Sequence, residues 1–321
     1  MSSRPEFRGV MPANLMPFHE DLSINEEDYR RHLSWLANAP GVTAIVCNGH
    51  AAEVSSLDRD ERRRALAIAV DEVGDIVPLI AGVYADGSLE AARLAKDCEE
   101  EGANGLLIFP PSLFSLGAQL RPEMAYAHFA RIADSVDLPM VVFQYPPANG
   151  IGYTPEILVK LTEIPQVAAI KEWSNDIVAF EKNLKTIRET GRQVSILSSY
   201  TMSLLSTFVL GADGAISGLG SVVAELQAKL FDLTKQGNIE EACRLNDRLY
   251  PLVAEIYKPP IVDMHNRMKE ALVMLGRIDE AIVRPPLMKL SEKEREQIRS
   301  ALKKSGLTEP EHAIKDQDLS A

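Results

Sequence analysis

Residues 138–171, LPMVVFQYPPANGIGYTPEILVKLTEIPQVAAIK, contain one complete unit of the pattern that decides the fold. An apolar run (138–145) is followed by a helix from Thr154, with Pro155 in its first turn, and then by a second apolar run (167–171). Proline is well tolerated in the first turn of a helix. Apolar runs without polar alternation are typical of parallel strands that are buried on both faces. The segment therefore predicts two parallel strands joined by a helix.

Units of this kind repeat eight times along the chain. The expected strands are 9–17, 42–48, 77–83, 105–109, 138–145, 167–171, 194–198 and 214–217. The expected helices are 25–38, 57–73, 88–101, 122–136, a stretch from 154, 176–189, 202–210 and 222–236. Ser23 is expected to cap the first helix. Eight such units predict an α/β protein of the (β/α)8 TIM-barrel type, since open doubly wound sheets usually have fewer strands.

Three further helical stretches, 239–256, 262–275 and 291–304, follow the last unit. We therefore expect a barrel over residues 1–237 and a C-terminal helical extension, 238–305, packed on it. The remaining residues, 306–321, are mostly polar and lack periodicity, which is typical of a flexible tail.

The composition excludes several classes of protein. The chain has 321 residues, with 34 Lys and Arg against 46 Asp and Glu, and its formal net charge is −12. This acidic balance disfavours nucleic acid or an anionic membrane as a partner. No stretch approaches the roughly 18 apolar residues of a membrane span, and no apolar region typical of a signal peptide follows the N-terminus. Three widely spaced cysteines predict reduced thiols in a cytoplasmic protein.

Lys171 ends the sixth expected strand, at the edge of a barrel where catalytic residues are found. Burial at the barrel mouth would lower the pKa of its amine. A neutral amine can attack a ketone and form a Schiff base. The alternative is a structural lysine that forms an ion pair with Glu172 or with a carboxylate of a neighbouring strand.

Tyr145 and His50 are further candidates. Tyr145 ends the strand before that of Lys171, so its phenol could carry protons during imine formation. The alternative is a tyrosine that packs under the turn at Pro146 and Pro147. His50 follows the second strand, where small residues expose backbone N–H groups that can hold a carboxylate. Its imidazole could act as an acid or base, or could simply be hydrogen-bonded. The charged run 58–64, DRDERRR, is interpreted as a solvated helix face.

These positions together resemble a known family. Residues 49–53 stand where it has Gly-Thr-Thr-Gly-Glu, Gly152 follows Tyr145 by seven residues, and Lys171 lies in Ile-Lys-Glu. Further matches are GADGAIS (211–217) and VRPPL (283–287). From about residue 9 to 302, the chain resembles a divergent member of the dihydrodipicolinate synthase and N-acetylneuraminate lyase family of class I, pyruvate-type Schiff-base lyases.

The resemblance implies a role for each position. Lys171 would form an imine with the ketone of a 2-oxo acid, and Tyr145 would carry the protons. The backbone at His50 and Ala51 would hold the carboxylate of that acid, and the Ile216 region would face the substrate. The lysine supplies the electron sink, so the resemblance implies neither a metal nor an organic cofactor. It also implies a homotetramer built as a dimer of dimers.

The chain departs from the family pattern at several positions. His50 and Ala51 replace two threonines, the first of which normally relays protons to the tyrosine. The loop 109–114 has no tyrosine, Gly150 stands where dihydrodipicolinate synthases have arginine, and 198–201 lacks the acidic residues of sialic acid lyases. Lysine biosynthesis and sialic acid cleavage are therefore both disfavoured.

The second half of the substrate is expected to face an apolar wall of Leu113, Phe114, Tyr200 and Trp173. An aldehyde with few hydroxyls and no second carboxylate would suit that wall. Leu113 and Phe114, together with the appended helices, are also the expected subunit interface.

The leading hypothesis is a Schiff-base aldolase or lyase of a 2-oxo acid, with pyruvate as donor or product. A dehydratase of a 2-keto-3-deoxy acid that uses the same imine is the alternative. Two other classes are a non-catalytic homologue and a barrel isomerase or phosphate-binding enzyme. For the last of these, Gly218-Leu219-Gly220 is the one short candidate loop.

Overall fold

Eight parallel strands form the centre of the computed structural model, which describes residues 7–307. They are β1 (Gly9–Pro12), β2 (Ile45–Cys47), β3 (Leu79–Val83), β4 (Gly105–Ile108), β5 (Met140–Gln144), β6 (Val167–Glu172), β7 (Ser195–Ser198) and β8 (Gly214–Ser217). From β2 to β8 each strand pairs with the next one along the chain, and β1 pairs with β8. Backbone hydrogen bonds from Thr43 to Val10 (3.0 Å) and from Asn14 to Val46 (3.1 Å) join β1 to the β2 segment. The predicted (β/α)8 barrel is confirmed.

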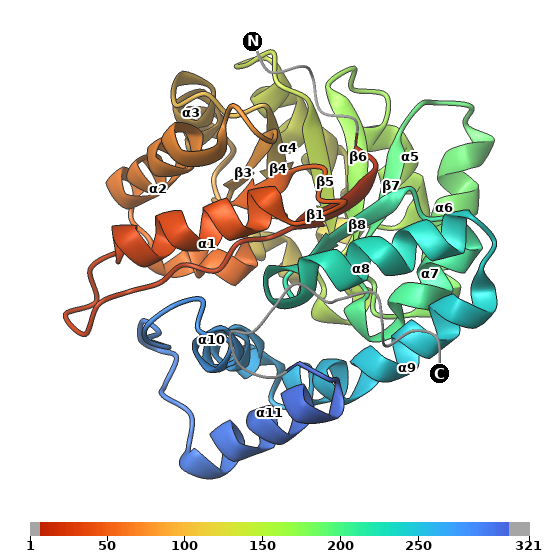
Figure 1. Cartoon of the computed structure of the whole chain (residues 1–321). Coiled ribbons are helices and arrows are strands. Elements are labelled where there is room, and N and C mark those ends of the chain that lie inside the picture. The colour runs from red at the N-terminus through yellow and green to blue at the C-terminus, as the bar shows by residue number, and fades with distance from the viewer. Residues whose placement is uncertain (1–6, 308–321) are drawn as a thin grey trace.

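A ring of helices surrounds these strands (Figure 1). It consists of α1 (Glu26–Asn38), α2 (Arg59–Val73), α3 (Ser88–Glu100), α4 (Pro122–Ala133), α5 (Pro155–Leu161), α6 (Ile177–Glu189), α7 (Leu204–Leu210) and α8 (Gly220–Lys235). The expected cap of the first helix is wrong. Asn25 caps α1 by accepting a hydrogen bond from the Asp28 N–H, whereas the Ser23 hydroxyl is bonded to Asp21.

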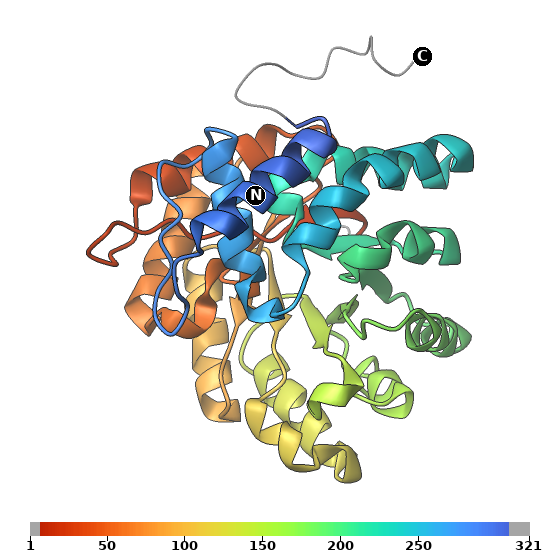
Figure 2. The same ribbon diagram turned by 90° about the horizontal axis from the view of Figure 1, so that it is seen from below.

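Three more helices, α9 (Ile239–Ile256), α10 (Met264–Met274) and α11 (Glu292–Lys304), follow the barrel. They lie at one end of it, and α10 and α11 are in front of the strands in the view from below (Figure 2). Helix α9 packs against both α8 and α11. Of the expected tail, residues 308–321 lie outside the described residues.

Short 3-10 helices occupy many of the loops. They are η1 (His50–Ala52), η2 (Val54–Ser56), η3 (Ser112–Leu116), η4 (Ala118–Leu120), η5 (Pro147–Asn149), η6 (Thr201–Ser203) and η7 (Ile261–Asp263). The first six, η1–η6, lie in strand-to-helix connections of the barrel, and the seventh, η7, precedes α10. In a TIM barrel the loops that follow the strands build the active site, so η1 is of particular interest.

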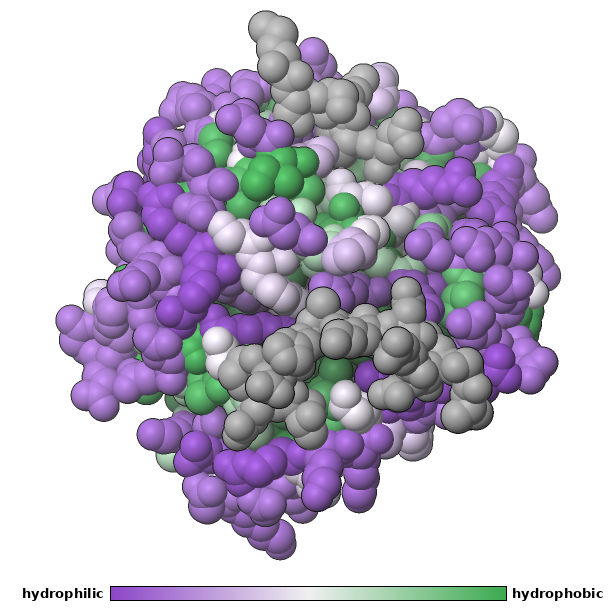
Figure 3. Space-filling view, in the orientation of Figure 1, coloured by the Kyte–Doolittle hydropathy of each residue, from purple (hydrophilic) through white to green (hydrophobic). Residues whose placement is uncertain are grey.

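Polar and charged residues cover most of the face shown in Figure 3, and apolar residues form separate small patches there. In the described part of the chain no helix is both long and apolar enough to cross a membrane. Cys47 and Cys98 are buried and Cys243 is exposed, and all three are free thiols. Residues 7–307 contain no group of three or more His, Cys, Asp or Glu side chains arranged to hold a metal ion.

Candidate active site

Lys171 lies near the carboxyl end of β6, between Phe143 of β5 and Leu197 of β7. Only 4% of the residue is exposed, and its Nζ lies 3.8 Å from the centre of the Phe143 ring. Burial in these surroundings lowers the pKa of the amine to about 7, because the charged form is poorly solvated there. A substantial fraction of this lysine is therefore neutral near pH 7.

Glu172 does not neutralise Lys171, because successive side chains of a strand point to opposite faces. Its carboxylate accepts hydrogen bonds from the Asn183 amide (2.9 Å) and from the Ser174 N–H (3.2 Å) and hydroxyl (3.1 Å). Within residues 7–307 no carboxylate forms an ion pair with Lys171. The alternative of a structural, ion-paired lysine is wrong.

Tyr145 follows β5 directly, and its hydroxyl is hydrogen-bonded to Nε2 of His50 at 2.7 Å. Burial raises the pKa of this phenol well above its usual value, so the hydroxyl is protonated at neutral pH. The loop behind it comes close because position 152 is glycine: a Cβ there would lie 2.5 Å from the Tyr145 carbonyl oxygen. The Gln144 side chain stabilises the same loop: its amide donates to the Tyr153 carbonyl (2.9 Å) and accepts from the Tyr153 N–H (2.8 Å).

The η1 turn brings His50 and Ala51 beside Lys171. The Ala52 N–H donates to the Gly49 carbonyl and the Glu53 N–H to the His50 carbonyl. In the described chain, the N–H groups of His50 and Ala51 have no backbone acceptor, and such free N–H groups can bind a carboxylate. Burial, the His265 imidazole and the Lys171 ammonium all lower the pKa of His50. The imidazole is therefore neutral near pH 7.

Glu53 fixes the end of this turn to the C-terminal segment. Its carboxylate accepts hydrogen bonds from Lys269 Nζ of α10 (2.5 Å) and from the Arg284 N–H (2.9 Å). The Arg284 side chain in turn donates to the Leu22 carbonyl and pairs with Glu61. Two sequence motifs more than two hundred residues apart, 49–53 and 283–287, thus meet in space and hold η1 in place.

The barrel mouth and the C-terminal helical segment together line a cavity of about 30 Å³ around Lys171. It is lined by Ala13, His50, Ala51, Phe143, Lys171, Trp173, Ser199, Gly218, Tyr257, Met264, His265 and Met268. Four of these residues, Tyr257, Met264, His265 and Met268, belong to the C-terminal helical segment. Sequence reasoning missed them because nothing in the apolar pattern of 262–275 marks the side that faces the barrel mouth.

The other predicted site residues are more scattered. Ile216 is completely buried in β8, and the cavity is lined by Gly218 two residues later. Tyr200 is half-buried beside η6, and Leu113 is 56% exposed on η3, both outside the lining of this cavity. Phe114 is buried against the ring of His128. The expectation that Phe114 lies on an apolar surface is therefore wrong, because η3 turns its side chain inward.

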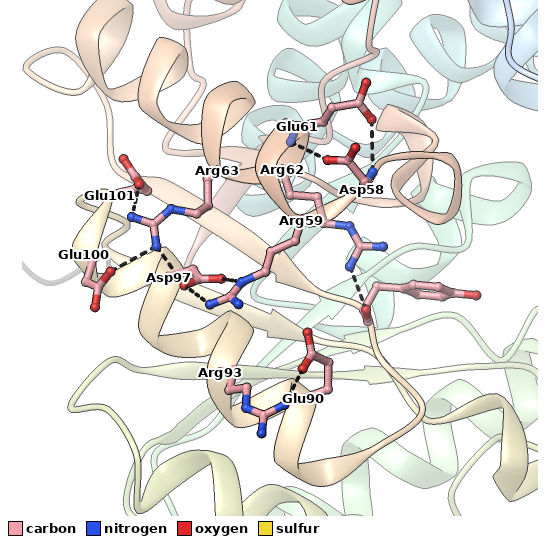
Figure 4. Close-up of polar contacts among 11 residues, drawn as sticks. Asp58, Arg59, Glu61, Arg62, Arg63, Glu90, Arg93, Asp97, Glu100 and Glu101 are labelled. Atoms are coloured by element: carbon pink, nitrogen blue, oxygen red, sulfur yellow. Dashed lines mark hydrogen bonds and ion pairs between the residues drawn. The ribbon is translucent and has the colours of Figure 1, made fainter.

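The charged run 58–64 joins α2 to α3 (Figure 4). Arg59 donates two hydrogen bonds to Asp97 (2.6 and 2.9 Å), and Arg63 contacts Asp97, Glu100 and Glu101. Arg62 donates instead to backbone carbonyls of Leu57 and Tyr84. These guanidinium groups are engaged within the protein, so the run holds two helices together and offers no open anion site.

Comparisons with known proteins show what the chain as a whole is similar to. The model of the dihydrodipicolinate synthetase family matches residues 6–305. The 4-hydroxy-tetrahydrodipicolinate synthase of Methanopyrus kandleri is 33% identical over 306 residues, which cover 94% of this chain and 97% of that protein. The corresponding synthase of Thermodesulfovibrio yellowstonii is 30% identical, with 94% and 99% covered. The crystal structure of dihydrodipicolinate synthase from Thermotoga maritima aligns with a TM-score of 0.83 at 27% identity, covering 94% and 99% of the two chains.

Proposed function

Since this chain belongs to the dihydrodipicolinate synthetase family, whose members are lyases of the class I aldolase type, we propose that it is a Schiff-base aldolase of a 2-oxo acid. Pyruvate is the donor or the product, and Lys171 is the lysine that forms the imine. The observation that carries the proposal is the amine of Lys171, which is buried beside Phe143 without a carboxylate partner among the described residues and has a pKa lowered to about 7.

The reaction begins when the neutral amine of Lys171 attacks C2 of the 2-oxo acid. The ketone oxygen leaves as water, and the protonated imine then withdraws electrons from C3. In the cleavage direction the C3–C4 bond breaks, its electron pair forms the enamine, and the C4 hydroxyl loses its proton as the aldehyde forms. The enamine then takes up a proton at C3 and becomes the imine of pyruvate. Water hydrolyses this imine, which releases pyruvate and restores the amine. The lysine supplies the electron sink, as is general for this family.

Tyr145 moves the protons in this scheme, and His50 takes the place of the threonine that other family members have. The 2.7 Å hydrogen bond between the Tyr145 hydroxyl and His50 Nε2 supports this relay. A neutral imidazole has both a donor and an acceptor nitrogen, so it can exchange protons with the phenol in concert with the substrate, without forming an imidazolium. The substrate carboxylate is assigned to the free N–H groups of His50 and Ala51.

The aldehyde that partners the 2-oxo acid is proposed to carry no carboxylate of its own. Gly150 has φ of +74°, and a Cβ there would lie 3.1 Å from the Ser115 carbonyl oxygen. The backbone at this position therefore suits glycine and not the arginine of the synthases. The cavity lining contains no arginine among the described residues. The curated relatives are named 4-hydroxy-tetrahydrodipicolinate synthases, and we propose a different aldehyde for this chain, with few hydroxyls and no acid group.

The proposal includes a cytoplasmic homotetramer, built as a dimer of dimers. Leu113, Leu116 and Leu120 on η3 and η4 are 56%, 83% and 86% exposed, and exposed apolar clusters favour subunit contacts. This surface replaces Phe114 as the interface candidate. The buried free thiols of Cys47 and Cys98 fit a reducing compartment.

Two measurements test the proposed chemistry. The protein is incubated with pyruvate and borohydride, and the intact mass is compared with that of Lys171→Ala, in which we expect no adduct. The wild-type protein is then given 4-hydroxy-2-oxopentanoate, and pyruvate is assayed with lactate dehydrogenase. Pyruvate and acetaldehyde support the aldolase. A dehydrated product with an intact carbon skeleton favours the dehydratase. If no adduct forms with pyruvate or longer 2-oxo acids, the protein is a non-catalytic homologue.

A further inference from the structure

Helix α10 brings His265 to the wall of the active-site cavity. The ring of His265 lines the cavity together with Lys171, and its centre lies 6.1 Å from that of His50. It is flanked by Met264 and by Met268 one turn further along the helix. The family motifs in the sequence assign no role to His265. Its ring nevertheless lies in the same cavity as Lys171 and His50.

The imidazole of His265 is uncharged and available to a ligand. Burial and the ammonium groups of Lys171 and Lys269 lower its pKa to about 3. The ring therefore presents one donor and one acceptor nitrogen at neutral pH. Within residues 7–307 neither nitrogen is hydrogen-bonded to another group of the protein. A neutral, unpartnered imidazole suits a hydroxyl or carbonyl oxygen better than a carboxylate.

The positions of the reacting atoms decide which part of the cavity wall remains for the rest of the substrate. C2 is joined to Lys171 Nζ, and the carboxylate lies at the free N–H groups of η1. The chain beyond C3 then extends along the remaining wall, in which Ser199 and Gly218 lie on the barrel side and Met264, His265 and Met268 lie on α10. The Tyr257 hydroxyl on the same side already donates to Thr201 at 3.2 Å. This leaves His265 as the polar group of the α10 wall.

We propose that His265 recognises the oxygen on C4 of the substrate and so selects hydroxylated 2-oxo acids over their deoxy analogues. The inference rests on the proposed imine at Lys171. In this assignment His265 is a specificity residue. It contacts the C4 oxygen through a hydrogen bond and selects substrates whose part beyond C3 is uncharged. Imine formation at C2 depends on Lys171 and Tyr145. The appended helices thus supply substrate selectivity as well as a cover for the barrel.

A competition experiment tests this inference. Equal concentrations of 4-hydroxy-2-oxopentanoate and 2-oxopentanoate, which differ only in the C4 oxygen, are mixed with the protein and trapped with borohydride. The reduced adducts on Lys171 are distinguished by mass, and the hydroxy acid is counted as its own adduct plus the pyruvyl adduct that cleavage leaves on the lysine. The ratio of this sum to the 2-oxopentanoate adduct gives the preference. We expect the wild-type protein to favour the hydroxy acid about tenfold, the effect of one good hydrogen bond.

Variants identify the residue responsible. His265→Leu should bring the ratio close to one, whereas His265→Asn, which keeps a hydrogen-bonding group, should retain part of the preference. His19→Leu, the same substitution at an exposed histidine outside the cavity lining, is the matched control and should keep the wild-type ratio. Ser199→Ala tests the alternative that the serine on the β7 side of the cavity makes the contact, and we expect it to keep the preference. Full labelling by saturating pyruvate shows that each variant is folded.

Three results would overturn the inference. They are an absence of preference in the wild-type protein, a wild-type ratio in His265→Leu, and loss of the preference in Ser199→Ala but not in His265→Leu. Failure of the proposed function looks different, since no acid would then label wild-type Lys171 at all, and the inference would fall with it.

Discussion

Lys171 and Lys269 are both buried, one at a strand end of the barrel and one on α10, but their surroundings differ. Lys171 has an aromatic ring at 3.8 Å and no ion-pair partner in the described chain, and it opens onto the cavity. Lys269 pairs with Glu53 and also donates to the Ile282 carbonyl at 2.6 Å. Burial lowers the pKa of both amines, and the Glu53 carboxylate opposes that fall at Lys269. Burial alone therefore does not make a lysine reactive. The absence of an ion-pair partner for its amine distinguishes Lys171 from Lys269.

The largest expected effect is on catalysis at Lys171. Lys171→Met removes the only nucleophile of the proposed mechanism and should lower kcat by about 10⁴-fold or more. Steady-state turnover of 4-hydroxy-2-oxopentanoate measures it. Lys171→Arg, which keeps the charge but cannot form the imine, should be equally inactive. Substantial turnover in either variant would assign the chemistry to another group.

The same substitution at Lys269 should act on stability. Lys269→Met leaves the Glu53 carboxylate buried without its partner, and loss of one member of a buried pair costs about 3–5 kcal/mol. Urea unfolding at pH 7 measures the change. The double variant Lys269→Met/Glu53→Gln is the control and should recover part of the loss, since it removes the uncompensated charge. A single variant as stable as the wild type would show that this pair does not hold η1 to α10.

Tyr145 extends the comparison of the two lysines, because it is the proton carrier that we propose for Lys171. Tyr145→Phe should lower kcat by about a hundredfold or more, the usual contribution of a positioned acid or base, with a smaller change in KM. Tyr153→Phe is the matched control, since the Tyr153 hydroxyl is buried without a hydrogen-bond partner among residues 7–307. Equal turnover in the two variants would exclude Tyr145 as the proton shuttle.

Lys171→Met should also stabilise the chain, in contrast to Lys269→Met. The folded pKa of Lys171 is about 7, below the 10.5 of an exposed lysine. Between these values the unfolded chain binds a proton that the folded chain does not, so wild-type stability rises with pH. Removing the amine should therefore add about 2–4 kcal/mol at or below pH 7 and little near pH 10.5. Urea unfolding at pH 6, 8 and 10 tests this. A loss of stability at pH 6 would contradict it.

The sequence predicts the barrel and its reactive lysine for the same reason. Strands buried on both faces leave uninterrupted apolar runs, and a lysine that ends such a run stands out. The identity of each helix cap is harder to predict, because Ser23 and Asn25 are both good capping residues. In the structure the Ser23 hydroxyl donates to Asp21, and the Asn25 side chain accepts from the Asp28 N–H.

The rest of the site depends on tertiary contacts that local patterns do not encode. Glu53 and Lys269 are 216 residues apart, and no periodicity connects them. His265 lies on a helix whose position was predicted, but its orientation is set by how α10 packs over the barrel mouth. From the sequence, Phe114 is expected on the surface because it lies in a loop. The residues next to it in the sequence do not predict the η3 turn that buries its side chain.

Borohydride trapping with pyruvate, followed by peptide mapping of both buried lysines, tests the central claim most directly. One digest reports the reduced adduct on the Lys171 and Lys269 peptides, so each site is the internal control of the other. We predict complete labelling of Lys171 and none of Lys269, with a labelling rate that rises as the pH increases from 6 to 8. An adduct on Lys269, equal labelling of both, or none on Lys171 would contradict the account.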